Sequence, residues 1–400
     1  MPVIHTPTEQ ELKSFFSRGV AEAIPQQEFL KKLQSGNRMR IYLGVDPTGP
    51  SIHVGHAVIL RSLRTLQEWG HEIILLIGDF TARIGDPTGR DAARVTLTHE
   101  EILKNAETYK EQAGKILDFS GSNPARIDFN ANWLAKLTFV DVIKLASQFT
   151  VQRMMERDMF EKRWNEGKPI YVHEFLYPLM QGYDSVAMDV DVECGGTDQT
   201  FNMLAGRTLQ DAINHHEKVV LTFELLEGLD GRKMSKSYNN IIGVMETPND
   251  MFGKIMSVRD DLIVRYFRLC TNVSDSDIAD IEKELSSGQN PRDIKMRLAR
   301  EVIALYHSAV EAERAEAEFK KVFQDKKAPT DIPSYTLTAE DATIVDVLIH
   351  VGFATSKSEA RRLIEQGGVK LRDEKVSDAT VAPSAGTLQA GKRKFVKLQK

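Results

Sequence analysis

The sequence has few cysteines and no long apolar run. Its two cysteines, Cys194 and Cys270, are far apart and form no pairing pattern, so neither a disulfide framework nor a zinc knuckle is expected. No stretch approaches the roughly 20 apolar residues that a membrane-spanning helix requires, and residues 1–19 lack a basic start followed by an apolar run. We therefore expect a cytoplasmic protein with no membrane partner.

A general excess of basic residues is also absent. The 400 residues carry a formal net charge of −5, which excludes a uniformly basic nucleic-acid binder. Residues 351–400 differ, because eleven Lys and Arg against five Asp and Glu give +6 there and leave −11 for residues 1–350. A chain of this length accommodates two or three domains, and any contact with RNA is expected to use a local patch near the C-terminus.

Two short segments indicate phosphate chemistry. Residues 53–56 read HVGH and precede an amphipathic helix, where unpaired backbone N–H groups and the helix dipole attract phosphate. Residues 233–237 read KMSKS and form an expected loop whose two ammonium groups can close over a triphosphate. Alone, a histidine pair is more often structural and a lysine loop is usually just solvated. The two in this order, about 180 residues apart, predict ATP chemistry.

Apolar runs flank the HVGH segment. Strands are expected over Met39–Val45 and Ile73–Ile77 with the helix between them, and this β-α-β pattern predicts a parallel sheet that binds ligands beyond the carboxyl ends of its strands. A further strand is expected over Met188–Cys194. Three carboxylates alternate along that strand on an expected exposed face, which favours a solvated face over a metal cluster: Asp189, Asp191 and Glu193.

The other segments are expected to be mostly helical. Residues 1–36 and 98–164 have this pattern, as do residues 278–285 and 293–323. A polar, proline-punctuated linker follows at 324–333.

The two phosphate segments resemble the two signatures of class I aminoacyl-tRNA synthetases. Four further segments narrow the resemblance to the tyrosyl-tRNA synthetases of bacterial type, in the branch with a KMSKS signature: Ile41–Thr48, Ile84–Arg90, Tyr177–Asp184 and Gly195–Gln199. The tail, which reads as a basic helix, a glycine turn and a strand, resembles a small RNA-binding domain shared with a ribosomal protein.

The resemblance implies an α/β fold with three parts. Residues 1–227 would form a Rossmann-like parallel-sheet catalytic domain, with a helical dimerisation insertion at about 98–170. Residues 228–330 would carry the KMSKS loop and a helical anticodon-binding domain. Residues 341–400 would form a small C-terminal α+β RNA-binding domain.

The implied function is that of a homodimeric tyrosine–tRNA ligase. Its substrates would be L-tyrosine, ATP with Mg²⁺, and tRNA(Tyr), with no metal held by protein ligands alone. The implied catalytic residues are His53, His56, Lys233, Lys236 and Thr48. The implied tyrosine-binding residues are Tyr42, Asp86, Tyr177, Gln181, Asp184 and Gln199. The implied ATP-binding residues are Gly44, Asp46, Gly55, Gly195, Gly196, Asp198, Lys236 and Ser237. The implied RNA-binding residues are Lys357, Arg361 and Arg362.

The sequence departs at three positions from the better-known branch of the family, and three other functions remain open. Leu43 stands where a cysteine is common in the better-known branch, Glu193 stands where glutamine is common, and Phe80 lies in a glycine-rich turn. A tryptophanyl-tRNA synthetase would share the fold and signatures but lack the phenol-reading pair Tyr42 and Asp184. A nucleotidylyltransferase would not need the second signature, and a non-enzymatic RNA-binding paralogue would not need intact histidines and lysines.

Overall fold

The computed structural model describes residues 2–47, 49, 51–87, 98–234, 238–323, 333–391 and 394–399. The predicted site residues Thr48, Lys236 and Ser237 lie outside this part of the chain, as does most of the expected linker. The chain divides into two compact units, Met1–Ala309 and Val310–Lys400, which are described separately below.

A mostly parallel sheet forms the centre of the first unit. The strand order is β1-β6-β5-β2-β3-β4, and every neighbouring pair is parallel except β1 and β6. The strands are β1 (Val20–Ile24), β2 (Arg40–Val45), β3 (Glu72–Ile77), β4 (Arg126–Phe129), β5 (Val192–Gly196) and β6 (Val219–Phe223). The chain leaves β2 toward β3 and later returns to β5 on the other side of β2, which makes a topological switch point where ligands bind. The expected α/β fold with a parallel sheet is confirmed.

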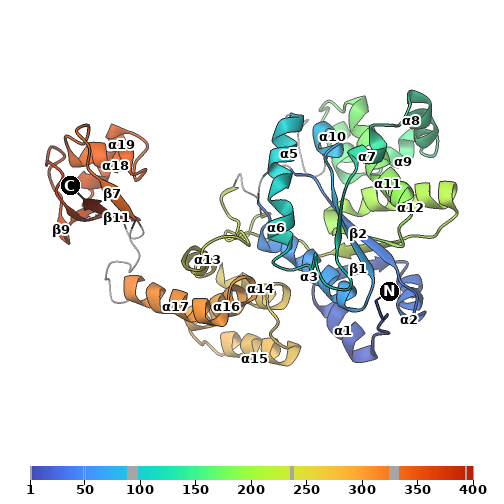
Figure 1. Cartoon of the computed structure of the whole chain (residues 1–400), viewed down its shortest axis with the longest axis horizontal. Coiled ribbons are helices and arrows are strands. Elements are labelled where there is room, and N and C mark those ends of the chain that lie inside the picture. Colours follow the sequence, from blue (N-terminus) through green and yellow to red (C-terminus); the bar gives the residue numbers. More distant parts are fainter. Residues whose placement is uncertain are drawn as a thin grey trace. The chain divides into compact units, whose positions relative to one another are not determined.

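Helices cover both faces of this sheet. Figure 1 shows α3 (Val54–Glu68) on one side of the strands and α11 (Leu176–Met188) with α12 (Thr200–Asn214) on the other. The backbones of α11 and α12 approach closely, because a Cβ added to Gly182 would lie 3.1 Å from the Gly206 Cα. The other helices of this part are α1 (Glu9–Ser17), α2 (Gln26–Gln34), α4 (Thr81–Ile84), α5 (His99–Glu107), α6 (Tyr109–Ala113), α7 (Ala131–Leu134), α8 (Phe139–Ala146), α9 (Val151–Met155) and α10 (Asp158–Asn165), with the short turns η1 (Val172–Phe175) and η2 (Thr197–Gln199).

Three sequence predictions about this sheet were wrong in part. Residues 1–36 contain β1, and the segment 98–164 contains β4, so both edges of the sheet come from segments expected to be helical. Edge strands are short and carry weak alternation, which hides them in the sequence. The strand expected over Met188–Cys194 begins only at Val192, because Asp189 ends α11 in the left-handed conformation.

The acidic face expected on that strand does not exist. Asp191 accepts a hydrogen bond from Lys32 at 2.9 Å, and Asp189 lies at the helix end beside His216. Glu193 is buried, with 1% of its surface exposed, and pairs with Lys218. The three carboxylates therefore serve three different contacts, and the expected solvated face was wrong because Glu193 points into the protein.

Helices follow the sheet, as the sequence predicted. They are α13 (Pro248–Ile255), η4 (Asp260–Leu262), α14 (Ile263–Cys270), α15 (Asp275–Ser286), α16 (Pro291–Tyr306) and α17 (Ala309–Phe323). Pro248 and Pro291 each stand at the first helical position, where the missing N–H costs nothing. The expected helices at 278–285 and 293–323 are confirmed, the second as two helices.

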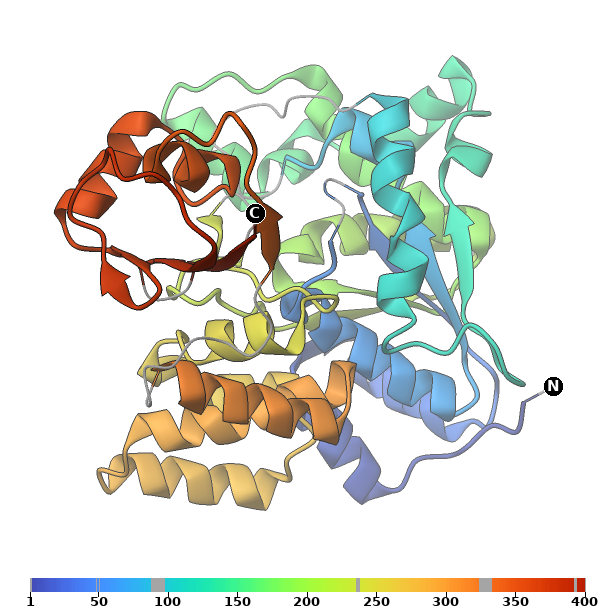
Figure 2. The same ribbon diagram turned by 60° about the vertical axis from the view of Figure 1, so that its left-hand side comes forward.

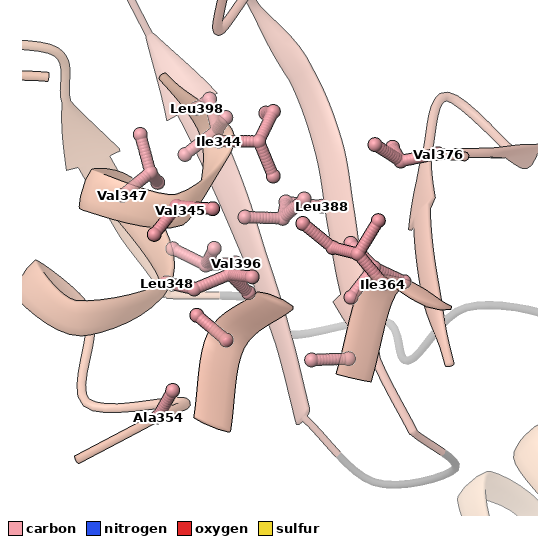
Figure 3. Close-up of a cluster of buried hydrophobic side chains, with 13 residues drawn as sticks. Ile344, Val345, Val347, Leu348, Ala354, Ile364, Val376, Leu388, Val396 and Leu398 are labelled. Carbon is pink, nitrogen blue, oxygen red and sulfur yellow. The ribbon is translucent and has the colours of Figure 1, made fainter. Parts of the chain in front are cut away.

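The C-terminal part of the second unit is an α+β domain. Its sheet has the order β7-β11-β10-β8-β9, and the helices of the domain pack on one side of these strands (Figure 2). The elements are β7 (Ser334–Thr336), α18 (Ile344–His350), α19 (Lys357–Glu365), β8 (Val369–Leu371), β9 (Glu374–Lys375), β10 (Gly386–Ala390) and β11 (Lys394–Gln399). Leu348, Ile364, Leu388 and Val396 meet in its own apolar core (Figure 3), so the domain buries a core without the rest of the chain.

None of the helices described is long and apolar enough to cross a membrane.

Candidate active site

A cavity of about 370 Å³ opens at the carboxyl ends of β2, β3 and β5. This is the switch point of the sheet, where parallel α/β folds bind ligands. The cavity brings together every predicted catalytic, tyrosine-binding and ATP-binding residue that the structure describes: Tyr42, Gly44, Asp46, His53, Gly55, His56, Asp86, Tyr177, Gln181, Asp184, Gly195, Gly196, Asp198, Gln199 and Lys233.

The two signature segments are held together by backbone hydrogen bonds. The Val54 N–H donates to the Ile242 carbonyl at 2.9 Å, just beyond the KMSKS segment. His53 is the N-cap of α3, and its ring stacks on that of His56 with the centroids 3.8 Å apart. A Cβ on Gly55 would lie 3.4 Å from the Met234 sulfur, in ordinary van der Waals contact, so the loop packs on the start of the helix. Side chains from both segments line the same cavity.

Lys233 contacts the turn that follows β5. Its ammonium nitrogen lies 2.9 Å from a carboxylate oxygen of Asp198, and its side chain is 59% exposed. Asp198 follows Gly195 and Gly196, and a Cβ on Gly196 would lie 2.7 Å from the Asp198 carboxylate. Glycine at this position therefore leaves room for the Asp198 carboxylate beside the backbone of the turn.

The deepest part of the cavity is lined by Tyr42 and Asp184, which are 1% and 3% exposed. The Asp184 carboxylate accepts hydrogen bonds from the Trp133 indole at 2.8 Å and from the Asn130 amide at 3.2 Å. Burial raises the pKa of Asp184 well above its usual range, and these two hydrogen bonds oppose that rise. The arrangement is a buried acceptor suited to a ligand hydroxyl.

Asn130 and Trp133 were not predicted as part of the site. Both follow β4, the edge strand that was expected to be helix. Asn130 also donates to the Thr81 hydroxyl at 3.0 Å and accepts from the Phe80 N–H at 2.9 Å. The available signal was position, because Asn130 directly follows the carboxyl end of a parallel strand.

Tyr177 and Asp46 form a second pair in the cavity. The Tyr177 hydroxyl donates to one Asp46 oxygen at 2.8 Å, and the Thr81 hydroxyl donates to the other at 2.7 Å. Burial, and then the Asp46 and Asp86 carboxylates, raise the pKa of Tyr177 well above its usual value. The Tyr177 hydroxyl therefore keeps its proton and directs it at Asp46, and the lone pairs of its oxygen can accept a hydrogen bond from a ligand.

Asp86 and Gln199 lie together at the mouth of the same cavity. The Gln199 amide donates to Asp86 at 2.7 Å, and Arg157 donates to the other Asp86 oxygen at 3.1 Å. Arg157 is 5% exposed and lies over the rings of Phe160 and Phe201. Arg157 was not predicted, because nothing in its local sequence marks it as a partner of Asp86.

Gln181 is tied to the buried carboxylate on β5. Its amide nitrogen donates to Glu193 at 3.0 Å, and Glu193 also accepts from Lys218, which is fully buried. Lys218 and Ser185 were not predicted to belong to this region.

The predicted RNA-binding residues lie on α19 in the second unit. Lys357, Arg361 and Arg362 are all exposed, and Lys357 lies 3.1 Å from Asp346. Ser356 caps the helix by accepting from the Glu359 N–H, so the helix begins directly at the basic residues.

Among the residues that the structure describes, no group of three or more His, Cys, Asp or Glu side chains is arranged to hold a metal ion.

Comparison with known families assigns both parts of the chain. Residues 34–324 match the family described as tRNA synthetases class I (W and Y). Residues 324–398 match the tyrosine–tRNA ligase SYY-like C-terminal domain.

Individual relatives agree with this assignment. The chain is 51% identical over 386 residues to tyrosine–tRNA ligase 2 of Vibrio cholerae, covering 95% of this chain and 96% of the relative. It is 49% identical over 415 residues to tyrosine–tRNA ligase of Carboxydothermus hydrogenoformans, covering 100% and 99%.

Solved structures share the fold. A C-terminally truncated mitochondrial tyrosyl-tRNA synthetase of Coccidioides posadasii superposes with a TM-score of 0.61 at 26% identity, over 76% of this chain and 90% of that chain. The family matches and the relatives together place this chain in the tyrosine–tRNA ligase family of class I aminoacyl-tRNA synthetases.

Proposed function

We propose that the chain forms tyrosyl-adenylate from L-tyrosine and ATP in the cavity described above, releases pyrophosphate, and transfers tyrosine to the 3′-terminal adenosine of tRNA(Tyr). The observation that carries this proposal is the joining of two subsites in one cavity. One end presents the buried acceptors Tyr42 and Asp184, and the other presents His53, His56 and Lys233 as donors.

The buried end suits the phenol of tyrosine. Asp184 is fixed by Trp133 and Asn130, so its carboxylate accepts a hydrogen bond from the phenol without moving. A ligand without the hydroxyl would leave a buried lone pair of this carboxylate without a donor, which costs roughly 1–3 kcal/mol. Discrimination against phenylalanine follows from that penalty.

The ammonium of tyrosine would be bound by acceptors from α11 and from the segment that follows α4. The Gln181 amide N–H donates to Glu193, so its carbonyl oxygen can accept from the ammonium. The Tyr177 O–H donates to Asp46, so the lone pairs of the Tyr177 oxygen can accept as well. Asp86 supplies the negative charge, and Gln199, held beside it, orients the substrate carboxylate. This leaves the carboxylate free to attack.

Activation requires the carboxylate to attack the α-phosphorus of ATP in line. No general base is needed, because the carboxylate is already ionised. The protein therefore positions the reactants and stabilises charge that moves onto pyrophosphate, which is the role proposed for His53, His56 and Lys233. Lys236, Ser237 and Thr48 are proposed to assist there from the sequence alone.

The ribose of ATP is proposed to lie at the end of β5. Asp198, beside Gly195 and Gly196, would accept from the ribose hydroxyls, and Gly44 and Asp46 would border the nucleotide.

Mg²⁺ is proposed to enter with ATP. The phosphate end offers imidazole and ammonium groups rather than a ring of carboxylates, so phosphate oxygens and water would hold most of the ion's positions.

Transfer to tRNA is proposed to use two further regions. The helices within residues 228–330 would contact the anticodon, and the exposed Lys357, Arg361 and Arg362 would contact phosphates from the tail. Both contacts lie outside the cavity, so activation without tRNA is expected.

A homodimer is proposed through the segment 98–170 and its immediate continuation. Large apolar side chains are exposed along this segment: Phe139 and Val172 are each 80% exposed and Val151 is 70% exposed, and an exposed apolar surface favours a protein interface. Phe139→Asp should shift the sedimentation coefficient from dimer to monomer. Val3→Asp, at a residue 90% exposed elsewhere, is the matched control and should leave the dimer intact. A monomeric wild-type protein would contradict the proposal.

ATP–pyrophosphate exchange measured with each of the twenty amino acids tests the proposed reaction. Exchange with tyrosine alone is expected. Exchange with tryptophan instead would indicate a tryptophanyl-tRNA synthetase, and binding of tRNA without exchange would indicate an RNA-binding paralogue. A cytoplasmic location is proposed with this function, because its substrates are those of protein synthesis.

A further inference from the structure

A buried ion pair lies against the tyrosine end of the cavity. The Lys218 ammonium donates to a Glu193 carboxylate oxygen, and the two side chains are 0% and 2% exposed. Lys218 directly precedes β6, and Glu193 lies on the neighbouring parallel strand β5, so sheet pairing brings them together. A Cβ on Gly206 of α12 would lie 2.5 Å from the Lys218 nitrogen. The fold has therefore left room for this ammonium.

Such a pair is not explained by stability. Burial lowers the pKa of Lys218, and the Glu193 charge opposes that effect. Removing two charges from water offsets most of their attraction, and apolar residues of similar volume often stabilise a protein equally well. The hydrogen bonds that the pair makes toward the cavity point to a different role.

Glu193 fixes the orientation of Gln181. One Glu193 oxygen accepts from the Gln181 amide nitrogen at 3.0 Å, and the other accepts from Lys218 and from the Ser185 hydroxyl, the latter at 3.2 Å. An ionised carboxylate accepts and never donates. Gln181 must therefore turn its N–H toward Glu193 and its carbonyl oxygen away from it.

The same pair fixes the direction of the Tyr42 hydrogen bond. Ser185 has one proton, which it donates to Glu193, and it accepts from Lys218 at 2.8 Å. The Tyr42 hydroxyl lies 3.0 Å from the Ser185 oxygen, and with the Ser185 proton on Glu193 the Tyr42 hydroxyl donates to the remaining Ser185 lone pair. The Tyr42 proton thus points away from the cavity, and its oxygen is left as an acceptor.

We propose that Lys218 and Glu193 are positioning residues that set substrate specificity by making Tyr42 and Gln181 hydrogen-bond acceptors toward the cavity. Together with Asp184, which accepts from Trp133 and Asn130, the phenol end then presents acceptors to the ligand. A ligand with an ammonium at one end and donors facing both Tyr42 and Asp184 at the other is favoured by this arrangement. The inference rests on the proposed activation of tyrosine and states which hydrogen-bond roles the pocket presents at the position of the tyrosine hydroxyl.

The test compares ligands that differ in donor count. 4-Aminophenylalanine carries two N–H donors where tyrosine carries one O–H, and phenylalanine carries none. ATP–pyrophosphate exchange gives kcat/KM for each. In a Glu193→Gln, Lys218→Met double variant, Ser185 can donate to Tyr42 and Tyr42 can donate to the ligand. The kcat/KM for 4-aminophenylalanine divided by the kcat/KM for tyrosine should then fall by about tenfold, which is the effect of one mismatched hydrogen bond.

Two further variants keep the test decisive. Ser185→Ala removes the hydroxyl that links Tyr42 to Glu193 and Lys218, with only a small change of side-chain volume. It should lower the same ratio, and it replaces the double variant in the test if the double variant does not fold. Glu174→Gln removes charge from another buried ion pair, in which Arg163 lies 2.7 Å from Glu174, outside the cavity. This control should lose stability yet keep the wild-type ratio, since a purely structural role does not change ligand preference.

The outcomes separate the two proposals. If wild-type protein exchanges with tyrosine and the folded double variant or Ser185→Ala keeps the wild-type ratio, the role of Lys218 and Glu193 is wrong while the proposed function stands. If wild-type protein does not exchange with tyrosine, the proposed function is wrong and this inference with it.

Discussion

The Lys233 ammonium lies 2.9 Å from the Asp198 carboxylate, although the two residues are 35 positions apart in the sequence. Lys233 belongs to the KMSKS segment and Asp198 follows β5, so the contact joins the loop to the wall of the cavity. ATP that placed its ribose on Asp198 would release Lys233 toward the phosphates. With the proposed roles of the two residues, the pair would couple occupation of the ribose subsite to the availability of a phosphate donor.

Lys233→Ala should lower the rate of tyrosyl-adenylate formation by about two orders of magnitude, because the ammonium acts on charge that develops during the reaction. Stopped-flow or exchange kinetics measure this rate. The tyrosine dissociation constant should not change. Arg232→Ala is the matched control, since Arg232 bonds to Asp230 and lies over Tyr238. Equal losses in both variants would contradict a specific role for Lys233.

Trp133→Phe should weaken tyrosine binding by roughly 1–2 kcal/mol, because Asp184 loses its 2.8 Å hydrogen bond while an aromatic ring remains. Equilibrium dialysis with tyrosine measures the effect. Asn132→Ala, in the same short helix but bonded to Asp128, should bind tyrosine like the wild type. Unchanged affinity in Trp133→Phe would show that Asp184 does not depend on this bond.

As the pH is lowered, tyrosine affinity should begin to fall at a higher pH than it would if Asp184 had the pKa of an ordinary aspartate. Burial raises the pKa of Asp184 above its usual value, so the protonated form appears earlier as pH falls, and that form no longer offers a carboxylate to the phenol. Because the folded-state pKa is raised, the ionised form costs folding stability at neutral pH, and this cost disappears as pH falls through that pKa. Titration of tyrosine binding measures the midpoint. A midpoint near 4 would rule out the assignment.

Removal of residues 334–400 should leave ATP–pyrophosphate exchange near the wild-type rate, because every described residue of the cavity precedes residue 235. Binding of tRNA should weaken and lose part of its salt dependence, since the truncation removes Lys357, Arg361 and Arg362. Filter binding at several salt concentrations measures both. The tail has its own apolar core, so its loss should not unfold the remainder. An unchanged salt slope would identify α19 as an ordinary solvated helix.

The sequence by itself determined the central β-α-β unit and the two phosphate segments. Both are local features: continuous apolar strands have their own period, and a histidine or glycine at a helix start acts through the backbone beside it. The described residues predicted from these segments all line one cavity. The tail was also readable from its sequence, because its helix, glycine turn and strand follow directly along the chain.

Only the tertiary structure decided what surrounds the two subsites. The sequence could not show that β4 brings Asn130 and Trp133 to Asp184, because a short edge strand carries too few residues to reveal its period. Nor could it show that Glu193 faces Lys218 inside the protein, since alternation along a strand does not say which face is buried. That choice depends on which strands pair and which helices cover them, and these contacts join residues far apart in the chain.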